Sequence, residues 1–197
     1  MAITIRPATE ADIPGIVAVS TAAFDPATDA ITRRLFPASP AGSGSSDKGI
    51  LEWSVFRKSA RLHINRSVVM VAVDDDGSIV GYAMWFAPQA EEGAENGSLP
   101  PPPKRTFEGF DRDAATQLRR IMEEDGREMF GEKSTGGVWS MKLLQWGIDK
   151  AKAEGRDCYL VATPAGVPLY RAAGFEALRT LDIFGAPHVS MILKCGK

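Results

Sequence analysis

Apolar and polar positions along the chain follow helical and strand periods, which predict an alternating order of helices and strands. Over 138–154, apolar residues recur three or four positions apart, which predicts a helix with one buried face. The run Cys158–Ala162 (CYLVA) is apolar throughout, as in a strand buried on both faces. Next, Thr163-Pro164 and Gly174 predict the start and end of a helix of about ten residues. Because α/β units bind ligands at the carboxyl ends of strands, we expect the chemistry just after residue 162.

A β-hairpin is predicted in the first half of the chain. The apolar runs Val68–Val73 and Ile79–Phe86 are joined by DDDG, with Asp76-Gly77 at the turn. Spacing and capping residues predict the other elements: a strand over Ala2–Arg6, helices over 9–24, Ala30–Phe36, 51–62 and Asp111–Met129, and closing strands over Glu176–Leu181 and His188–Leu193 around a turn at Gly185–Pro187.

Two of these helices carry charged residues that are expected to face solvent. On the helix over 111–129 they are Glu123, Glu124 and Asp125. On and after the helix over 51–62 they are Arg57, Lys58, Arg61 and Arg66. Charge runs of this kind are usually solvated, and binding of an anion is the alternative for the basic set.

The chain is expected to form a single domain over 1–197 with two mobile loops. One loop, near 37–48, is rich in Pro, Gly and Ser, and the other, near 88–106, contains four successive prolines. The second loop is either a lid over the substrate or a simple surface loop.

Composition narrows the class of protein. With 197 residues, 44% of them hydrophobic, the chain is long enough to bury a core. A net charge of −2 gives no reason to expect nucleic acid or an anionic membrane as a partner. Two cysteines without a CxxC pattern suit a reducing compartment, and the N-terminus lacks a secretory pattern. We therefore expect a cytoplasmic protein, of an oligomeric state that the sequence leaves open.

A glycine pair precedes the helix over 138–154. Gly136 and Gly137 leave backbone N–H groups uncovered near the positive end of a helix dipole, which suits a phosphate. The alternative is an ordinary turn. His63 and His188 have no partner at metal or triad spacing, so both are expected to be structural and no metal site is predicted.

Tyr170 lies about two helical turns after the expected cap at Thr163. From spacing alone it either packs against the sheet or offers its hydroxyl to chemistry at the strand end.

Two long segments resemble a known family. The string LLQWGIDKAKAEGRDCYLVATPAGVPLYRAAGFEAL resembles the second half of the GNAT acetyltransferase superfamily, specifically its fungal small-molecule N-acetyltransferases. The opening ITIRPATEADIPGIVAVSTAAF resembles the first strand and helix of that family. The resemblance implies an α/β (α+β) fold, in which helices flank a mixed, mostly antiparallel central sheet.

The resemblance also implies an activity and a set of site residues. Acetyl-CoA would be the cosubstrate, and the primary amine of a small molecule would be the acceptor. The segment from Gly136 through Gly137 and Val138 to Ser140 would hold the pyrophosphate, and Thr163 is added to the cofactor-binding set. Tyr170 would be the general acid that protonates the leaving thiolate.

The middle of the chain departs from this family. Between Phe130 and Val138 stands only GEKSTGG, where the family has a central strand and a glycine turn, so about fifteen residues are missing. Trp139 is also bulky where the backbone must approach a phosphate. We therefore expect a sheet one strand short and acetyl-CoA affinity that is millimolar at best, about 4 kcal/mol. The alternative function is a catalytically impaired CoA-binding or structural member, or a truncated gene model.

Overall fold

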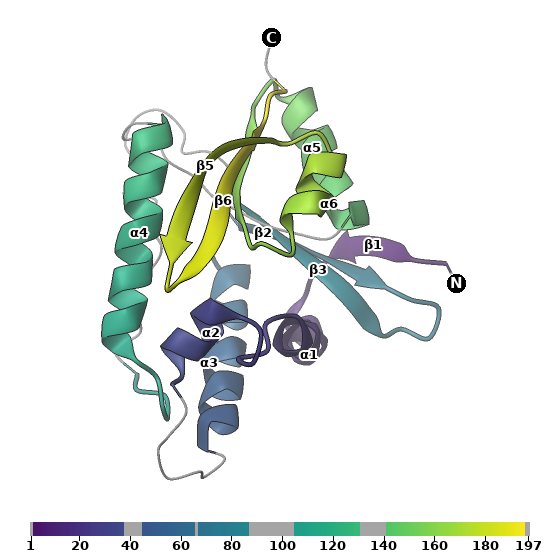
Figure 1. Ribbon diagram of the computed structural model, residues 1–197. Coiled ribbons are helices and arrows are strands. Elements are labelled where there is room, and N and C mark those ends of the chain that lie inside the picture. Colours follow the sequence, from purple (N-terminus) through teal and green to yellow (C-terminus); the bar gives the residue numbers. More distant parts are fainter. Residues whose placement is uncertain (1, 38–44, 66, 87–104, 131–140, 196–197) are drawn as a thin grey trace.

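The computed structural model describes residues 2–37, 45–65, 67–86, 105–130 and 141–195. Helices and strands alternate along these residues (Figure 1). Their bounds are β1 Thr4–Pro7, a 3-10 helix η1 Glu10–Asp12, α1 Ile13–Ala23, α2 Ala30–Leu35, α3 Ser45–Leu62, β2 Ser67–Val73, β3 Ile79–Phe86, α4 Arg112–Phe130, α5 Met141–Ala153, β4 Cys158–Ala162, α6 Val167–Ala172, β5 Glu176–Ile183 and β6 Ala186–Leu193.

The strands form two antiparallel sheets. The N-terminal sheet has the order β1-β2-β3 and the C-terminal sheet the order β4-β6-β5. The mixed α/β class with antiparallel strands is thus confirmed. Over the described ranges no strand pairing joins β3 to β4. Residues 125–130 are helical, and 131–137 lie outside the described residues, so the missing central strand stays a prediction.

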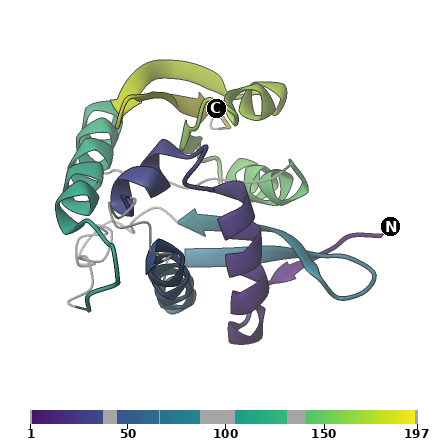
Figure 2. The same cartoon turned by 60° about the horizontal axis from the view of Figure 1, so that its bottom comes forward.

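The predicted hairpin is confirmed as β2 and β3. Gly77 has a φ of +87°, which the turn requires and which glycine adopts without strain. One face of this sheet packs on α1 and α3 through a core that includes Ile16, Val17 and Val71. Figure 2 shows α1 and α3 next to one another against these strands.

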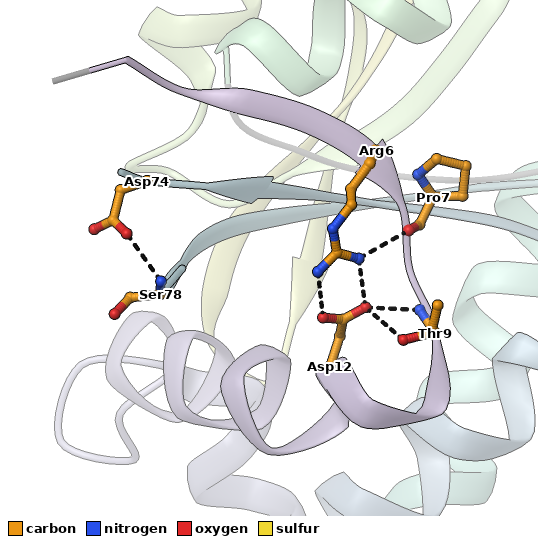
Figure 3. Close-up of polar contacts among 6 residues, drawn as sticks. All are labelled: Arg6, Pro7, Thr9, Asp12, Asp74 and Ser78. Carbon is orange, nitrogen blue, oxygen red and sulfur yellow. Dashed lines mark hydrogen bonds and ion pairs between the residues drawn. The ribbon is translucent and has the colours of Figure 1, made fainter. Parts of the chain in front are cut away.

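Polar contacts fix the passage from β1 to α1 (Figure 3). Both guanidinium Nη atoms of Arg6 donate to Asp12, each at 2.7 Å, and the backbone N–H and hydroxyl of Thr9 donate to the same carboxylate. The Arg6 hydrogen bonds hold the pKa of the buried Asp12 well below its usual range. Thr9 and Asp12 therefore form a capping box with an ionised carboxylate at the start of the helix.

Helix α5 joins the two sheets. Its predicted apolar stripe is confirmed where it is described: Leu144 and Ile148 are buried against β4. On another side, Gly147 lies against Trp85 of β3, and a Cβ at this position would be 2.0 Å from the indole Cζ2. Glycine is therefore required here for close helix–sheet approach. Gly155, with a φ of +63°, ends the helix as predicted.

Helix α4 covers the opposite face of the C-terminal sheet from α5 and α6 (Figure 1). The helix was predicted, but Asp125 does not face solvent: it is 1% exposed. Its carboxylate accepts hydrogen bonds from Ser190 at 2.8 Å, from Arg179 Nε at 2.7 Å and from the Tyr159 hydroxyl. The expectation for Asp125 was wrong because these partners stand on strands far away in the sequence.

Helix α3 also differs from expectation. The helix begins at Ser45, so the predicted loop near 37–48 extends too far at its C-terminal end. The earlier part of that predicted loop falls largely outside the described residues. Three apolar residues of α3, Leu51, Val55 and Phe56, are exposed. Of the basic residues that were expected to meet solvent, Lys58 and Arg61 face β3 instead, and Arg66 lies outside the described residues.

The closing hairpin is longer than predicted. The turn consists of Phe184 and Gly185, both with positive φ, instead of Gly185–Pro187. Two such residues match the right-handed twist of the flanking strands, which therefore continue as far as the turn.

Candidate functional site

A hollow of about 210 Å³ lies at the carboxyl end of β4, where the sequence placed the chemistry. Three segments line it: the α1–α2 connection, the turn after β4, and the start of β6. We call this cavity the β4 hollow. The residues that line it are Ala23, Phe24, Thr28, Asp29, Ala30, Thr163, Pro164, Ala165, Ala186 and His188.

Thr163 does not cap α6. The helix begins at Val167 after Gly166, with Pro168 in its first turn, and it is six residues long instead of about ten. The Thr163 carbonyl accepts hydrogen bonds from Gly166 N at 2.9 Å and Val167 N at 3.2 Å. The turn that these bonds close brings Thr163, the one described residue of the predicted cofactor-binding set, to the wall of the hollow.

His188 is the least expected residue of the hollow. It is 3% exposed, and its Nδ1 lies 3.1 Å from the carbonyl oxygen of Ala186. A carbonyl oxygen only accepts, so Nδ1 carries the proton and Nε2 of the neutral ring has a lone pair. This Nε2 is buried without a hydrogen-bond partner among the described residues. Burying a hydrogen-bond acceptor without a donor costs folding free energy, and an N–H group of a ligand would satisfy it.

Asp29 brings a carboxylate to the same hollow. One oxygen accepts a hydrogen bond from Thr32 N at 2.6 Å and caps α2. The half-buried carboxylate favours a positively charged group nearby. The lining of the hollow therefore combines a carboxylate with an imidazole whose Nε2 has no partner among the residues that the structure describes.

Tyr170 belongs to α6, on the other face of the C-terminal sheet. Its ring is 4% exposed, packs edge-on against Phe175 at 5.8 Å between centroids, and joins the core formed by β4 and α5. A Cβ at Gly166 would lie 3.0 Å from Tyr170 Cε2 and 3.4 Å from Thr163 Oγ1. The tyrosine thus adjoins the turn that walls the hollow without lining it. Burial raises the pKa of its hydroxyl, which stays protonated at neutral pH.

The end of α6 explains how Tyr170 is held. Phe175 N donates to the Tyr170 carbonyl at 2.9 Å and Gly174 N to the Arg171 carbonyl at 3.0 Å, while Gly174 has a φ of +92°. This is the Schellman cap that the sequence predicted, with Phe175 buried beneath it.

The other predicted site residues cannot be placed in this site. Gly136, Gly137, Val138 and Ser140 lie outside the described residues. His63 is exposed and pairs with Glu10 at 2.7 Å, away from the hollow. Across the described ranges no helix is both long and apolar enough to cross a bilayer.

Sequence spacing could not reveal His188 or Asp29. Their segments are separated by more than a hundred positions, and neither residue stands in a recognisable motif. The only local signal was the position of His188 at the start of a predicted closing strand.

Comparison with known proteins identifies the fold. No protein-family model matches the chain, and no curated protein sequence matches it either. Among solved structures, one of a histone acetyltransferase and related acetyltransferase from Corynebacterium glutamicum is 26% identical, with a TM-score of 0.55, over 98% of this chain and 96% of that one. A GNAT-superfamily phosphinothricin acetyltransferase from Sinorhizobium meliloti, solved in complex with acetyl-CoA, is 17% identical, with a TM-score of 0.55, over 100% of this chain and 90% of that one. The chain therefore has the fold of the GNAT-superfamily acetyltransferases over nearly its whole length.

Proposed function

We propose that this chain is an N-acetyltransferase that moves the acetyl group of acetyl-CoA to the amine of a small molecule. The β4 hollow carries this proposal, because His188 lines it and the Nε2 of this residue is buried without a hydrogen-bond partner among the described residues. The similarity to the Corynebacterium acetyltransferase supports acetyl transfer as the reaction.

Strand β4 offers a place for acetyl-CoA. Among the described strands it pairs only with β6, so its other edge has no described strand partner. An open strand edge presents backbone N–H and C=O groups, and the pantetheine arm carries amides that match them. Thr163 stands at the end of this edge, and together with Gly136, Gly137, Val138 and Ser140 it remains our proposed cofactor-binding set. The cosubstrate would supply the activated acetyl group.

Near the end of β4, one residue would attract the substrate ammonium group, a second would act as the base and a third as the acid. The Asp29 carboxylate attracts an ammonium group to the hollow. His188 Nε2 then accepts a proton, leaving the neutral amine that attacks the thioester. As the C–S bond breaks, the Tyr170 hydroxyl, which is protonated at neutral pH, gives its proton to the departing sulfur. The second proton that the attacking nitrogen loses then restores the hydroxyl.

A second function has an observation in its favour. Since β3 and β4 belong to separate sheets over the described residues, an impaired CoA-binding or structural protein would also account for the fold. The two are distinguished by assaying acetyl transfer to a panel of small amines and by calorimetry with acetyl-CoA.

We expect acetyl transfer together with millimolar acetyl-CoA affinity, roughly 4 kcal/mol. The weak affinity follows from the short segment before α5, which contains Trp139. Transfer to at least one amine supports the enzyme. Absence of both transfer and binding supports a structural protein, and low-micromolar binding would show that the predicted loss of affinity is wrong.

Replacing His188 by glutamine tests the proposed base. The amide occupies similar space but cannot accept a proton, so kcat should fall about tenfold. This is less than a base often contributes, because the unprotonated fraction of the amine reacts unaided. The deficit should shrink as the pH rises toward the pKa of the acceptor amine. Equal kcat values for both proteins at pH 7 would show that His188 only fills space.

A further inference from the structure

Helix α3 turns cationic side chains of its second half toward β3, whereas several of its apolar side chains are exposed. Leu51 and Val55 are 52% and 40% exposed, whereas Ser54 is 7% exposed. Arg57, Lys58 and Arg61 are half-buried on the inward side, and we call these three residues the α3 cation cluster. A helix that only filled the core would have the opposite pattern.

Each cation of the cluster rests on an aromatic ring. Arg57 Cζ lies 4.5 Å from the centroid of Trp53, Lys58 Nζ lies 4.6 Å from that of Tyr82, and Arg61 Cζ lies 5.2 Å from that of Phe86. Lys58 Nζ also donates to the Tyr82 hydroxyl at 2.7 Å. These contacts hold the three basic groups in place without supplying a countercharge.

No carboxylate compensates the cluster in the part of the chain that the structure describes. Besides the rings, Met84 Sδ lies 2.8 Å from Arg61 Nη1. The Tyr82 hydroxyl, which accepts from Lys58, in turn donates to Ser20 on α1 at 3.2 Å. Glu10 is bonded to Ser59 and His63 instead. Desolvation, followed by the neighbouring Arg57 and Arg61 charges, lowers the pKa of Lys58 to about 6. An anion placed here would offset both the loss of solvation and the repulsion between the neighbouring positive charges.

The cluster adjoins the β4 hollow through α1. Ser20 is bonded to Tyr82, and Ala23 and Phe24, one helical turn later, line the hollow. Residues three and four apart share one face of a helix, about 5 Å along its axis. Along α1, the contact of the cluster and the wall of the hollow are therefore about one helical turn apart.

We propose that the α3 cation cluster binds an anionic group, a carboxylate or a phosphate, on the same molecule whose amine enters the β4 hollow. The acceptor class is then an amine that also carries an acid, such as an amino acid, and a simple polyamine is excluded by charge repulsion. The acceptor part of this inference rests on the proposed function. The anion site itself does not, since it can bind an anion whether or not acetyl transfer occurs.

Anion binding is tested first, without acetyl-CoA. Inorganic phosphate and succinate are titrated separately into the full chain at constant ionic strength, with chloride as the reference, and binding is followed by calorimetry and by backbone amide NMR shifts. We expect millimolar binding with shifts centred on 54–61 and 82–86, and the tighter of the two anions identifies the acid group. Shifts centred elsewhere, or no binding of either anion, would overturn the proposal.

Two charge variants are compared in the same titration. Arg61→Gln should weaken binding about tenfold, as the loss of a charge-assisted contact does. Lys152→Gln removes an exposed charge on α5 and should leave binding unchanged. Equal weakening by both substitutions would indicate only a general effect of net charge and would overturn the site. Should Arg61→Gln fail to fold, Arg61→Lys keeps the charge and should bind within about threefold of the parent protein, because the ammonium still reaches the anion as a point charge.

Acceptor choice is tested second, with 3-aminopropanoate and propylamine, which share an amine and differ in the carboxylate. The parent protein should favour 3-aminopropanoate at least tenfold in kcat/KM, and Arg61→Gln should remove that preference mainly through KM. Transfer to both amines without preference would overturn the inference while leaving the proposed function intact. Absence of transfer to any amine would count against the proposed function, and the anion titration would still decide the site.

Discussion

Replacing Asp125 by alanine is expected to lower the free energy of unfolding by about 3 kcal/mol, the largest effect on stability that we expect from one side chain. The carboxylate joins α4 to both outer strands of the C-terminal sheet, through Arg179 on β5 and Tyr159 on β4, and to Ser190 on β6. Its removal leaves these donors unsatisfied in a buried place. We place the effect at the low end of the range for a broken buried pair, because Arg179 keeps Glu128 as a partner.

The measurement is urea unfolding followed by circular dichroism, with Glu128→Ala as the matched control. Glu128 pairs with the same Arg179 from the same helix, but its side chain is 59% exposed, so its removal should cost less than about 1 kcal/mol. If the two variants were equally stable, the Asp125 network would not be what fixes α4 to the sheet.

Replacing Tyr170 by phenylalanine is expected to lower turnover by roughly a hundredfold, the low end for a lost general acid. The ring contacts with Phe175 and the β4 core remain, so the free energy of unfolding should change little. Turnover is measured with a reactive amine at saturating acetyl-CoA, and stability by urea unfolding of the same samples.

A variant with an insertion tests whether the Tyr170 hydroxyl is catalytic or only contributes to packing. In it, a strand and glycine turn of the family's length are inserted before α5. If a missing strand limits this protein, the extended chain should be far more active, and Tyr170 should matter most there. An extended chain that is equally active with phenylalanine at position 170 would exclude the hydroxyl from catalysis.

Local chemistry allowed much of the fold to be read from the sequence. The bounds of β4, the β2–β3 hairpin and the Gly174 cap follow from interactions within a few residues. These are an apolar run, a short turn that needs positive φ at Gly77, and a helix end closed by positive φ at Gly174. The same local pattern, an apolar strand that ends at residue 162, led us to expect the functional site just after that residue, and the β4 hollow lies there.

The misplaced boundaries also have a local explanation. Thr163-Pro164 resembles a helix start, but its carbonyl instead closes a turn, and α6 starts at Val167. Val167-Pro168 also places a proline in a first helical turn, so proline position alone does not choose between two starts four residues apart.

Tertiary structure alone decided which polar residues are buried. Asp125 can be buried because its donors Tyr159, Arg179 and Ser190 come from strands at least 34 positions away. His188 meets Asp29 in one hollow only when the C-terminal sheet lies over the α1–α2 connection. In α3, periodicity showed an apolar and a basic face but not which one β3 would cover. Sequence fixes the spacing of side chains on a helix, whereas the direction each face takes depends on partners that the chain brings from a distance.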